Sequence, residues 1–177
     1  MSNTEYFEDT VPKINDKAWI HPQGLVIGDV HIDEFSSIWP FTVVRGDVHK
    51  IRIGKKTNIQ DGSVLHVSHD SHYMPGGAAL IIGEGVTVGH KVILHGCEIG
   101  NYCLIGMGSI VMDNVIVEPE VVLGAGSLVT SGKRLESGYL YRGSPAQKVR
   151  KLSDKEIEQL HYSAEHYVRL MHRHHST

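Results

Sequence analysis

Three histidines near the middle of the chain, His66, His90 and His95, could bind one metal ion through imidazole nitrogens. Three neutral imidazoles that leave a fourth position open for water are the ligand set of a catalytic zinc site, whereas a structural zinc site fills all four positions with protein ligands. Iron(II) and cobalt(II) also suit imidazole ligands. The sequence therefore predicts a metal site, with zinc as the expected ion.

These histidines lie within a six-residue repeat that predicts how they are held. An aliphatic residue opens each hexad from residue 82 onward and is often followed by glycine, as at Ile99 and Ile105. The same frame is found upstream over residues 20–44 and 53–65. A period of six fits neither an amphipathic helix nor an alternating strand. It fits short strands joined by corners, so that three hexads make one triangular coil with the aliphatic side chains stacked inside.

The frame also divides the chain into segments. We expect a β-helix over residues 1–130, with an excursion loop at 67–81 pushed out of one corner, and an irregular connection over 131–152. A Ser-x-x-Glu capping box then opens a helix over 153–175, in which apolar residues recur every three or four positions. The predicted fold is therefore all-β, a single-stranded parallel β-helix followed by a C-terminal α-helix.

Counting hexads brings two of the histidines together. His66 and His95 are the second residues of the hexads opened by Leu65 and Leu94, which lie three hexads apart once the loop is left out. Three hexads make one full turn, so the two imidazoles should stack on adjacent rungs, roughly 5 Å apart. His90 lies one side earlier, near the next edge. It can meet the pair of a neighbouring prism if three prisms pack around a threefold axis.

We expect no ligand role for the other histidines. Those of the early coils and of the helix and tail are expected on the surface, and the two in the excursion loop are expected to be exposed: His21, His31, His49, His161, His166, His172, His174, His175, and His69 with His72. Cys97 and Cys103 are expected to be reduced thiols, because disulfides are rare in the cytoplasm.

The composition narrows the class of protein. A chain of 177 residues has the size of one domain. Its net charge of −3, without a basic run, argues against nucleic acid or an anionic membrane as a partner. No apolar stretch approaches the length that spans a bilayer. The first residues show neither the basic nor the apolar region of a secretion signal, so a cytoplasmic location is expected.

A series of short motifs resembles, in order and spacing, the motifs of the γ-class carbonic anhydrases and their bacterial homologues: Arg45-Gly46-Asp47, Asn58-Ile59-Gln60-Asp61-Gly62, Leu65-His66, Val88-Gly89-His90 and Leu94-His95-Gly96. The resemblance runs from about Val11 to the C-terminal helix. It implies a left-handed coil, against the usual crossover preference. It also implies a homotrimer with a metal site at each subunit interface, where one subunit gives His66 and His95 and the next gives His90.

The resemblance further implies an activity and roles for individual residues. The activity is reversible hydration of CO₂ to bicarbonate by metal-bound hydroxide. Gln60 resembles the side chain that hydrogen-bonds the metal-bound water or hydroxide. Arg45 and Asp61 resemble an ion pair between subunits, which is either part of the catalytic machinery or only interface structure. Asp47 and Asn58 match further positions around the ligands.

The sequence departs from the most active members of that family at the positions that move protons. Val48 stands where they carry a glutamate, and the excursion loop contains no glutamate. Tyr162 matches a tyrosine that lines the family's site, but Ala164 replaces the asparagine two residues later. CO₂ hydration is therefore expected to be weak or absent.

Three functions remain open at the level of sequence. The first is a carbonic anhydrase-like enzyme. The second is an acyltransferase or thioesterase on the same repeat, which is disfavoured because no separate catalytic histidine remains once the three ligands are assigned. The third is a non-catalytic trimer that keeps its metal as a clamp between subunits.

Overall fold

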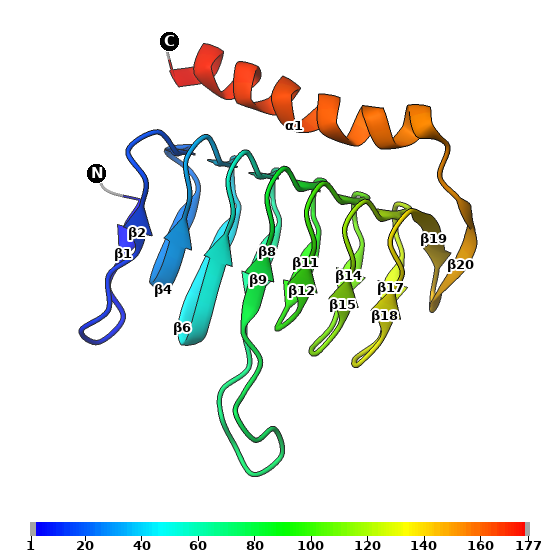
Figure 1. Cartoon of the computed structure of the whole chain (residues 1–177). Coiled ribbons are helices and arrows are strands. Elements are labelled where there is room, and N and C mark those ends of the chain that lie inside the picture. The colour runs from blue at the N-terminus through cyan, green and yellow to red at the C-terminus, as the bar shows by residue number, and fades with distance from the viewer. Residues whose placement is uncertain (1–2, 176–177) are drawn as a thin grey trace.

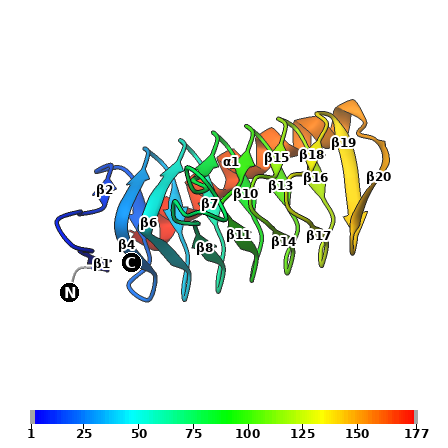
Figure 2. The same cartoon turned by 90° about the horizontal axis from the view of Figure 1, so that it is seen from below.

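The computed structural model describes residues 3–175 and confirms a parallel β-helix with one C-terminal helix. Short strands run along three flat faces, and every coil pairs in parallel with the coils before and after it (Figure 1). Two of the faces belong to one 12-stranded sheet and the third is an 8-stranded sheet. The coils are stacked like rungs along a single axis (Figure 2).

The first two faces are joined by the longest strands, β4 (Leu25–Ile32) and β6 (Val43–Ile53), with β1 (Thr4–Glu5) and β2 (Lys13–Ile14) paired to β4. The first face continues with β8 (Val64–His66), β11 (Ile93–His95), β14 (Ile110–Val111) and β17 (Leu128–Val129). The second face continues with β9 (Leu80–Ile82), β12 (Glu98–Ile99), β15 (Ile116–Val117) and β18 (Arg134–Leu135).

The third face consists of strands that each precede a first-face strand, closed by a hairpin at the C-terminal end: β3 (Trp19–Ile20), β5 (Ser37–Ile38), β7 (Asn58–Ile59), β10 (Thr87–Val88), β13 (Leu104–Ile105), β16 (Val122–Leu123), β19 (Tyr139–Gly143) and β20 (Ala146–Lys151). The last two pair antiparallel, unlike the rest of the coil.

The aliphatic residue of each hexad points inward and is removed from water, as the repeat predicts. Leu65, Leu94 and Val111 are fully buried and stacked in register on the first face. Close packing of coils also sets limits on the backbone. Gly28 has a φ of +75°, and a Cβ built on it would lie 2.5 Å from the carbonyl oxygen of Gly46. Only glycine fits such a position without strain.

The structure differs from the predicted boundary at residue 130. Leu135 in β18 pairs beside Val117, and Tyr141 in β19 pairs beside Leu123, so the coil continues well into the segment expected to be an irregular connection. Both residues lie on the hexad frame and are buried. The frame was missed because polar residues separate these hexads and because a tyrosine fills the last inward position.

The excursion loop leaves the coil at the predicted corner but ends two residues earlier than predicted, because β9 already begins at Leu80. A separate three-residue insertion lies in β6, opposite β4. The pairing of β4 with β6 shifts by three residues between Gly46 and Ile51. The loop leaves the coil after β8 and returns before β9. Its base is closed by a bridge in which the backbone N–H groups of Ser68 and Ala78 each donate to the other residue's carbonyl, at 3.1 and 2.9 Å.

Helix α1 (Asp154–His175) runs back along the coil from its C-terminal end and lies over the third face, where it contacts β5 and β10 (Figures 1 and 2). The predicted capping box is present, because the Glu156 carboxylate accepts from the backbone N–H of Ser153 at 2.9 Å. The helix residues Leu160, Ala164 and Met171 are buried.

Two predictions lie outside the described part of the chain: the first two residues of the β-helix and the exposure of the His175 side chain. Within the described residues, no helix is both long enough and apolar enough to cross a membrane.

Candidate metal centre

His66 and His95 face each other on the outside of the first face. Strands β8 and β11 pair so that His66 lies beside His95 on the adjacent rung, which confirms the placement predicted from the hexad frame. The ring centroids are 5.0 Å apart, and His66 Nδ1 lies 3.0 Å from His95 Nε2. Leu65 and Leu94, which directly precede the two histidines, point into the core. Because successive side chains of a strand point to opposite faces, both imidazoles point outward.

Each ring of the pair has a carboxylate at the nitrogen that points away from the other ring, and this carboxylate decides which nitrogen carries the proton. Asp47 lies 3.0 Å from His66 Nε2, and Asp113 lies 2.9 Å from His95 Nδ1. A neutral imidazole carries one N–H, and a carboxylate can only accept, so each ring's proton belongs on the carboxylate side. The two nitrogens that face each other are therefore both without a proton.

Two lone pairs at 3.0 Å repel each other unless a cation lies between them. Two nitrogens that share a tetrahedral zinc ion are about 3.3 Å apart, given metal–nitrogen distances near 2.0–2.1 Å. A carboxylate behind each ligating histidine is also the usual arrangement around such ions, since it sets the tautomer and the ring orientation. The residues of this pair thus fit a shared metal ion.

His90 lies apart from the pair, at the corner where the chain passes from the third face to the first. Its Nδ1 is 3.0 Å from an Asp61 carboxylate oxygen, so His90 has the same carboxylate support and presents Nε2. A turn at His90 and Lys91 separates this corner from strand β11, whose last residue is His95. Within the described residues of one chain, no three His, Cys, Asp or Glu side chains form a metal-holding group.

The electrostatics around the pair keep His66 neutral and Asp47 ionised. Burial lowers the pKa of His66, although the Asp47 hydrogen bond opposes this effect. Burial alone raises the pKa of Asp47, but hydrogen bonds from Arg45 and His66 outweigh it, and the net pKa is lowered. A neutral imidazole is the form that binds a metal, so these shifts favour a ligand role near neutral pH.

Gln60 lies near the His90 corner and is fixed by a chain of hydrogen bonds. Its Nε2 donates to Asn58 Oδ1 at 3.1 Å, and Asn58 Nδ2 donates to Thr87 Oγ1 at 3.1 Å. The Thr87 hydroxyl lies 3.0 Å from the hydroxyl of Ser163 on helix α1. Because the amide nitrogen of Gln60 is engaged within this chain, its oxygen is the group left to accept a hydrogen bond.

The helix places Tyr167 beside Gln60 of the same chain, and the role that the resemblance implies for Tyr162 stays a prediction. Tyr167 hydrogen-bonds Gln60, and its pKa is raised by burial and by the nearby Asp61 carboxylate. Tyr162 is 61% exposed and stacks near His166, away from Gln60 of its own chain. Sequence spacing cannot fix how a helix is rotated about its axis, because packing against the third face decides that.

Within one chain, Arg45 pairs with Asp47, and Asp61 pairs with His90. The ion pair predicted between Arg45 and Asp61 of different subunits therefore stays a prediction. Sequence reasoning missed Asp113, although it lies 18 residues after His95, which is one full coil of three hexads.

The other histidines are mostly placed as predicted. Those of the described helix and His69 and His72 are exposed, while His21, His31 and His49 are only half-buried. His49 Nε2 lies 3.2 Å from the carbonyl oxygen of Gly76 and thereby holds the excursion loop. Cys97 and Cys103 are free and buried, as expected for reduced thiols, and burial raises the pKa of both.

An unbroken row of apolar side chains runs along the outside of the first face beside the histidine pair. Successive members are register partners on neighbouring strands, and we call this row the apolar ladder: Leu25, Val43, Val64, Ile93, Ile110 and Leu128. Val64 and Ile93 are 41% and 39% exposed, and each lies two residues before a histidine of the pair. The middle of the row is exposed and its ends are half-buried, and an apolar row of this kind marks an interaction surface.

A second exposed apolar feature flanks His90. Successive coils meet at its corner through backbone hydrogen bonds from Gly62 N to Pro40 O, Lys91 N to Asp61 O, and Gly108 N to His90 O. This stacking produces what we call the corner ridge, formed by Phe41, Asp61, His90 and Met107. Phe41 is 66% exposed and Met107 is 58% exposed.

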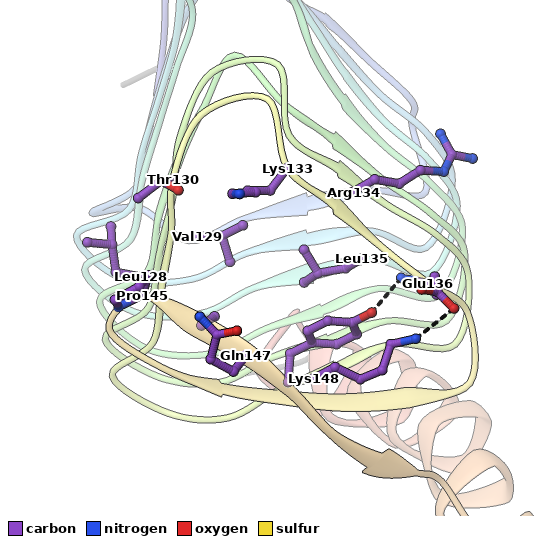
Figure 3. Close-up of a pocket in the computed structure, with 12 residues that line it drawn as sticks. Leu128, Val129, Thr130, Lys133, Arg134, Leu135, Glu136, Pro145, Gln147 and Lys148 are labelled. Atoms are coloured by element: carbon purple, nitrogen blue, oxygen red, sulfur yellow. Dashed lines mark hydrogen bonds and ion pairs between the residues drawn. The ribbon is translucent and has the colours of Figure 1, made fainter.

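The cavities of the single chain lie elsewhere. One of about 450 Å³ opens at the C-terminal end of the coil, between β17, β18 and the closing hairpin (Figure 3). Its polar rim includes the Lys148–Glu136 ion pair, at 2.7 Å. None of the three predicted ligands lines it. The histidine pair instead lies on an open face.

The chain is similar to several known proteins, most of them along nearly its whole length. A family model described as "Bacterial transferase hexapeptide (six repeats)" matches residues 96–131. The chain is 57% identical to Protein YrdA of Escherichia coli, over 92% of this chain and 89% of that protein. It is 42% identical to Gamma carbonic anhydrase 1, mitochondrial, of Arabidopsis thaliana, over 94% of this chain and 60% of that protein. A solved structure of a putative acetyltransferase of Bacillus cereus matches with a TM-score of 0.92 at 38% identity, over 99% of both chains.

Proposed function

The chain belongs to the family of hexapeptide-repeat proteins that includes Protein YrdA, and on that premise we propose that it is a metal-dependent, carbonic anhydrase-like enzyme. It interconverts CO₂ and bicarbonate at sites shared between the subunits of a homotrimer. The observation that carries this proposal is the pair of unprotonated nitrogens, His66 Nδ1 and His95 Nε2, that face each other at 3.0 Å with a carboxylate behind each ring. The 42% identity to a plant carbonic anhydrase supports the choice of reaction.

Two exposed features of the chain support the proposed trimer. The apolar ladder borders the histidine pair, and the corner ridge carries His90 between two exposed apolar side chains. A ring of three subunits lets the ridge of each chain pack against the ladder of the next, which is a heterologous, closed arrangement. Each contact then covers apolar surface and brings a third imidazole to a pair that lacks one.

A zinc ion held by His66, His95 and the neighbouring subunit's His90 would supply a hydroxide nucleophile near neutral pH, because it lowers the pKa of water. The protein's own groups do the remaining work. Asp47 and Asp113 hold the proton of each ring on the nitrogen away from the pair and fix the ring orientations. Gln60 belongs to the same corner as His90, and its amide oxygen would be free to accept a hydrogen bond from the hydroxide, because its amide nitrogen is held by Asn58.

The proton released by each turnover must leave through groups that titrate near the working pH. No glutamate stands in the excursion loop to serve this purpose. His69 and His72 are exposed there, but no hydrogen bond links either of them to His66 or His95. We therefore expect slow turnover, limited by proton removal.

The proposal is tested by metal analysis of the purified protein together with CO₂-hydration kinetics. We expect about one zinc ion per subunit and a rate above the buffer rate, and His66→Ala should remove both. Absence of bound metal in protein that has not been exposed to a chelator would refute the proposal. A full complement of metal without CO₂ hydration above the buffer rate would refute the proposed reaction but not the proposed metal site.

The structural match to a putative acetyltransferase favours a second candidate, acyl transfer or thioester hydrolysis on the same scaffold. A panel of acyl thioesters separates the two. Thioester turnover that survives His66→Ala would place the chemistry outside the histidine pair and support this second function.

A further inference from the structure

Asp113 and Ser68 form a connection between His95 and the base of the excursion loop. One oxygen of the Asp113 carboxylate lies 2.9 Å from His95 Nδ1 and also accepts from the Ser68 hydroxyl at 2.8 Å. Ser68 is the second residue after His66 and belongs to the bridge with Ala78 that closes the loop. A single carboxylate oxygen thus joins one member of the histidine pair to the loop.

The backbone around this carboxylate is shaped to admit it. Gly96 directly follows His95 and has a φ of +51°. A Cβ on Gly96 would collide with the Asp113 carboxylate and would lie 2.7 Å from the Ala78 side chain. Gly96 N donates to His66 O at 3.0 Å, and Asn114 N donates to Gly96 O at 2.8 Å. The coils on both sides of His95 therefore hold Gly96 in place, and the space above it is filled by Asp113.

We propose that Asp113 is a positioning residue for His95, and that Ser68 couples it to the excursion loop, so that the protein's affinity for its metal depends on the closed base of that loop. The metal part of this inference rests on the proposed function. Asp113 acts by holding the proton of His95 on Nδ1, which leaves Nε2 bare and aimed at His66. Ser68 acts by holding Asp113 in the rotamer that reaches His95.

The positioning role can be measured without metal. Imidazole ¹⁵N–¹H correlation spectra report which nitrogen of each histidine carries the proton, and His95→Gln assigns the His95 signals. The wild-type protein should show His95 protonated at Nδ1. Asp113→Ala should shift His95 toward the Nε2–H form, and Asp113→Asn should restore much of the Nδ1–H form, because the amide oxygen can still accept.

The coupling to the loop is measured by zinc affinity, in competition with a chromogenic chelator. Loss of the carboxylate behind a ligating histidine typically weakens metal binding about 10–100-fold, which we expect for Asp113→Ala. Ser68→Ala should weaken it less. The double variant should equal Asp113→Ala alone, because Ser68 acts only through Asp113.

Ser71→Ala is the matched control, since the Ser71 hydroxyl lies in the same loop and accepts a hydrogen bond from Met74 N, at 3.1 Å, away from Asp113. It should bind zinc like the wild type. Circular dichroism and light scattering check that each variant keeps its fold and assembly. If Asp113→Ala does not fold, Ser68→Ala keeps the test decisive, because wild-type zinc affinity in that variant would overturn the coupling to the loop.

The outcomes separate this inference from the proposed function. Wild-type protein whose zinc content does not depend on His66 would refute the proposed function and the metal part of this inference together. Zinc bound through His66, combined with wild-type affinity and an unchanged His95 tautomer in Asp113→Ala, would overturn this inference alone. Additive losses from Ser68→Ala and Asp113→Ala would overturn the coupling to the loop.

Discussion

The division of the metal site between two chains predicts a specific pattern of complementation. His90→Ala keeps the histidine pair but lacks the ridge ligand, whereas His95→Ala keeps the ridge ligand but has a broken pair. A trimer of either variant alone should contain no complete site. In a mixed trimer, a site is complete only where a His90→Ala chain gives its pair and the next chain around the ring is His95→Ala.

The magnitude follows from the cyclic symmetry. With random mixing of equal amounts, the two required choices combine to restore about one quarter of the wild-type sites. In mixed trimers isolated through a different affinity tag on each variant, every ring contains about one complete site in three, whichever chain is in excess. If all three ligands came from one chain, every site would lack a ligand and none would be restored.

The assay is zinc content per trimer after the two variants are unfolded together, refolded with zinc and purified by both tags. Mixing His66→Ala with His95→Ala is the matched control. Both of those variants break the pair, so no arrangement of them yields a complete site. Dual-tagged trimers of His90→Ala and His95→Ala that hold no more zinc than this control would refute the assignment of His90 to a neighbouring chain.

Three further predictions concern the scaffold. Leu94→Ala removes a fully buried side chain between the two histidine rungs and should lower the free energy of unfolding by about 2–5 kcal/mol, measured by chemical denaturation at fixed protein concentration. Gly28→Ala combines a positive φ with a carbonyl contact and should cost about 1–3 kcal/mol, more than Gly132→Ala, where φ is +71° and nothing lies within 4 Å. The Arg150 ion pair holds the pKa of Glu156 at about 2, below its usual 4.5, so its stabilisation of the helix start is present above pH 4.5 and lost as pH falls through about 2. The melting temperatures of the wild type and Glu156→Gln should therefore differ less as the pH falls from 4.5 to about 2. A difference that does not depend on pH would contradict a stabilising role for the ionised Glu156.

The hexad frame made the fold and the histidine pair predictable, because each position in a coil of fixed length has a defined neighbour one turn away. Leu65 and Leu94 could be aligned by counting, and the pairing of β8 with β11 follows that count. The same count extends to Leu135 and Tyr141. It was cut short because hexads with polar residues and a tyrosine depart from the aliphatic pattern.

Contacts that depend on how a side chain turns, or on how a helix docks, lie beyond such counting. Asp113 is one coil from His95, but only its rotamer shows that the carboxylate reaches the imidazole. The approach of Tyr167 to Gln60 depends on the rotation of helix α1 against the third face. Both contacts are set by tertiary packing, which the local sequence pattern does not specify.

The antiparallel hairpin at the C-terminal end has a consequence for how the molecule behaves in concentrated solution. A stack of parallel coils ends in an edge that another molecule's coil could extend, and repeated addition of this kind builds fibres. Strand β20 turns back against β19 and replaces that edge with one of opposite direction. It also carries Lys148, Arg150 and Lys151, and charged side chains on an edge strand disfavour pairing with another strand (Figure 3 labels Lys148). On the third face, the hairpin therefore disfavours end-to-end addition of a second molecule in the parallel register of the coil.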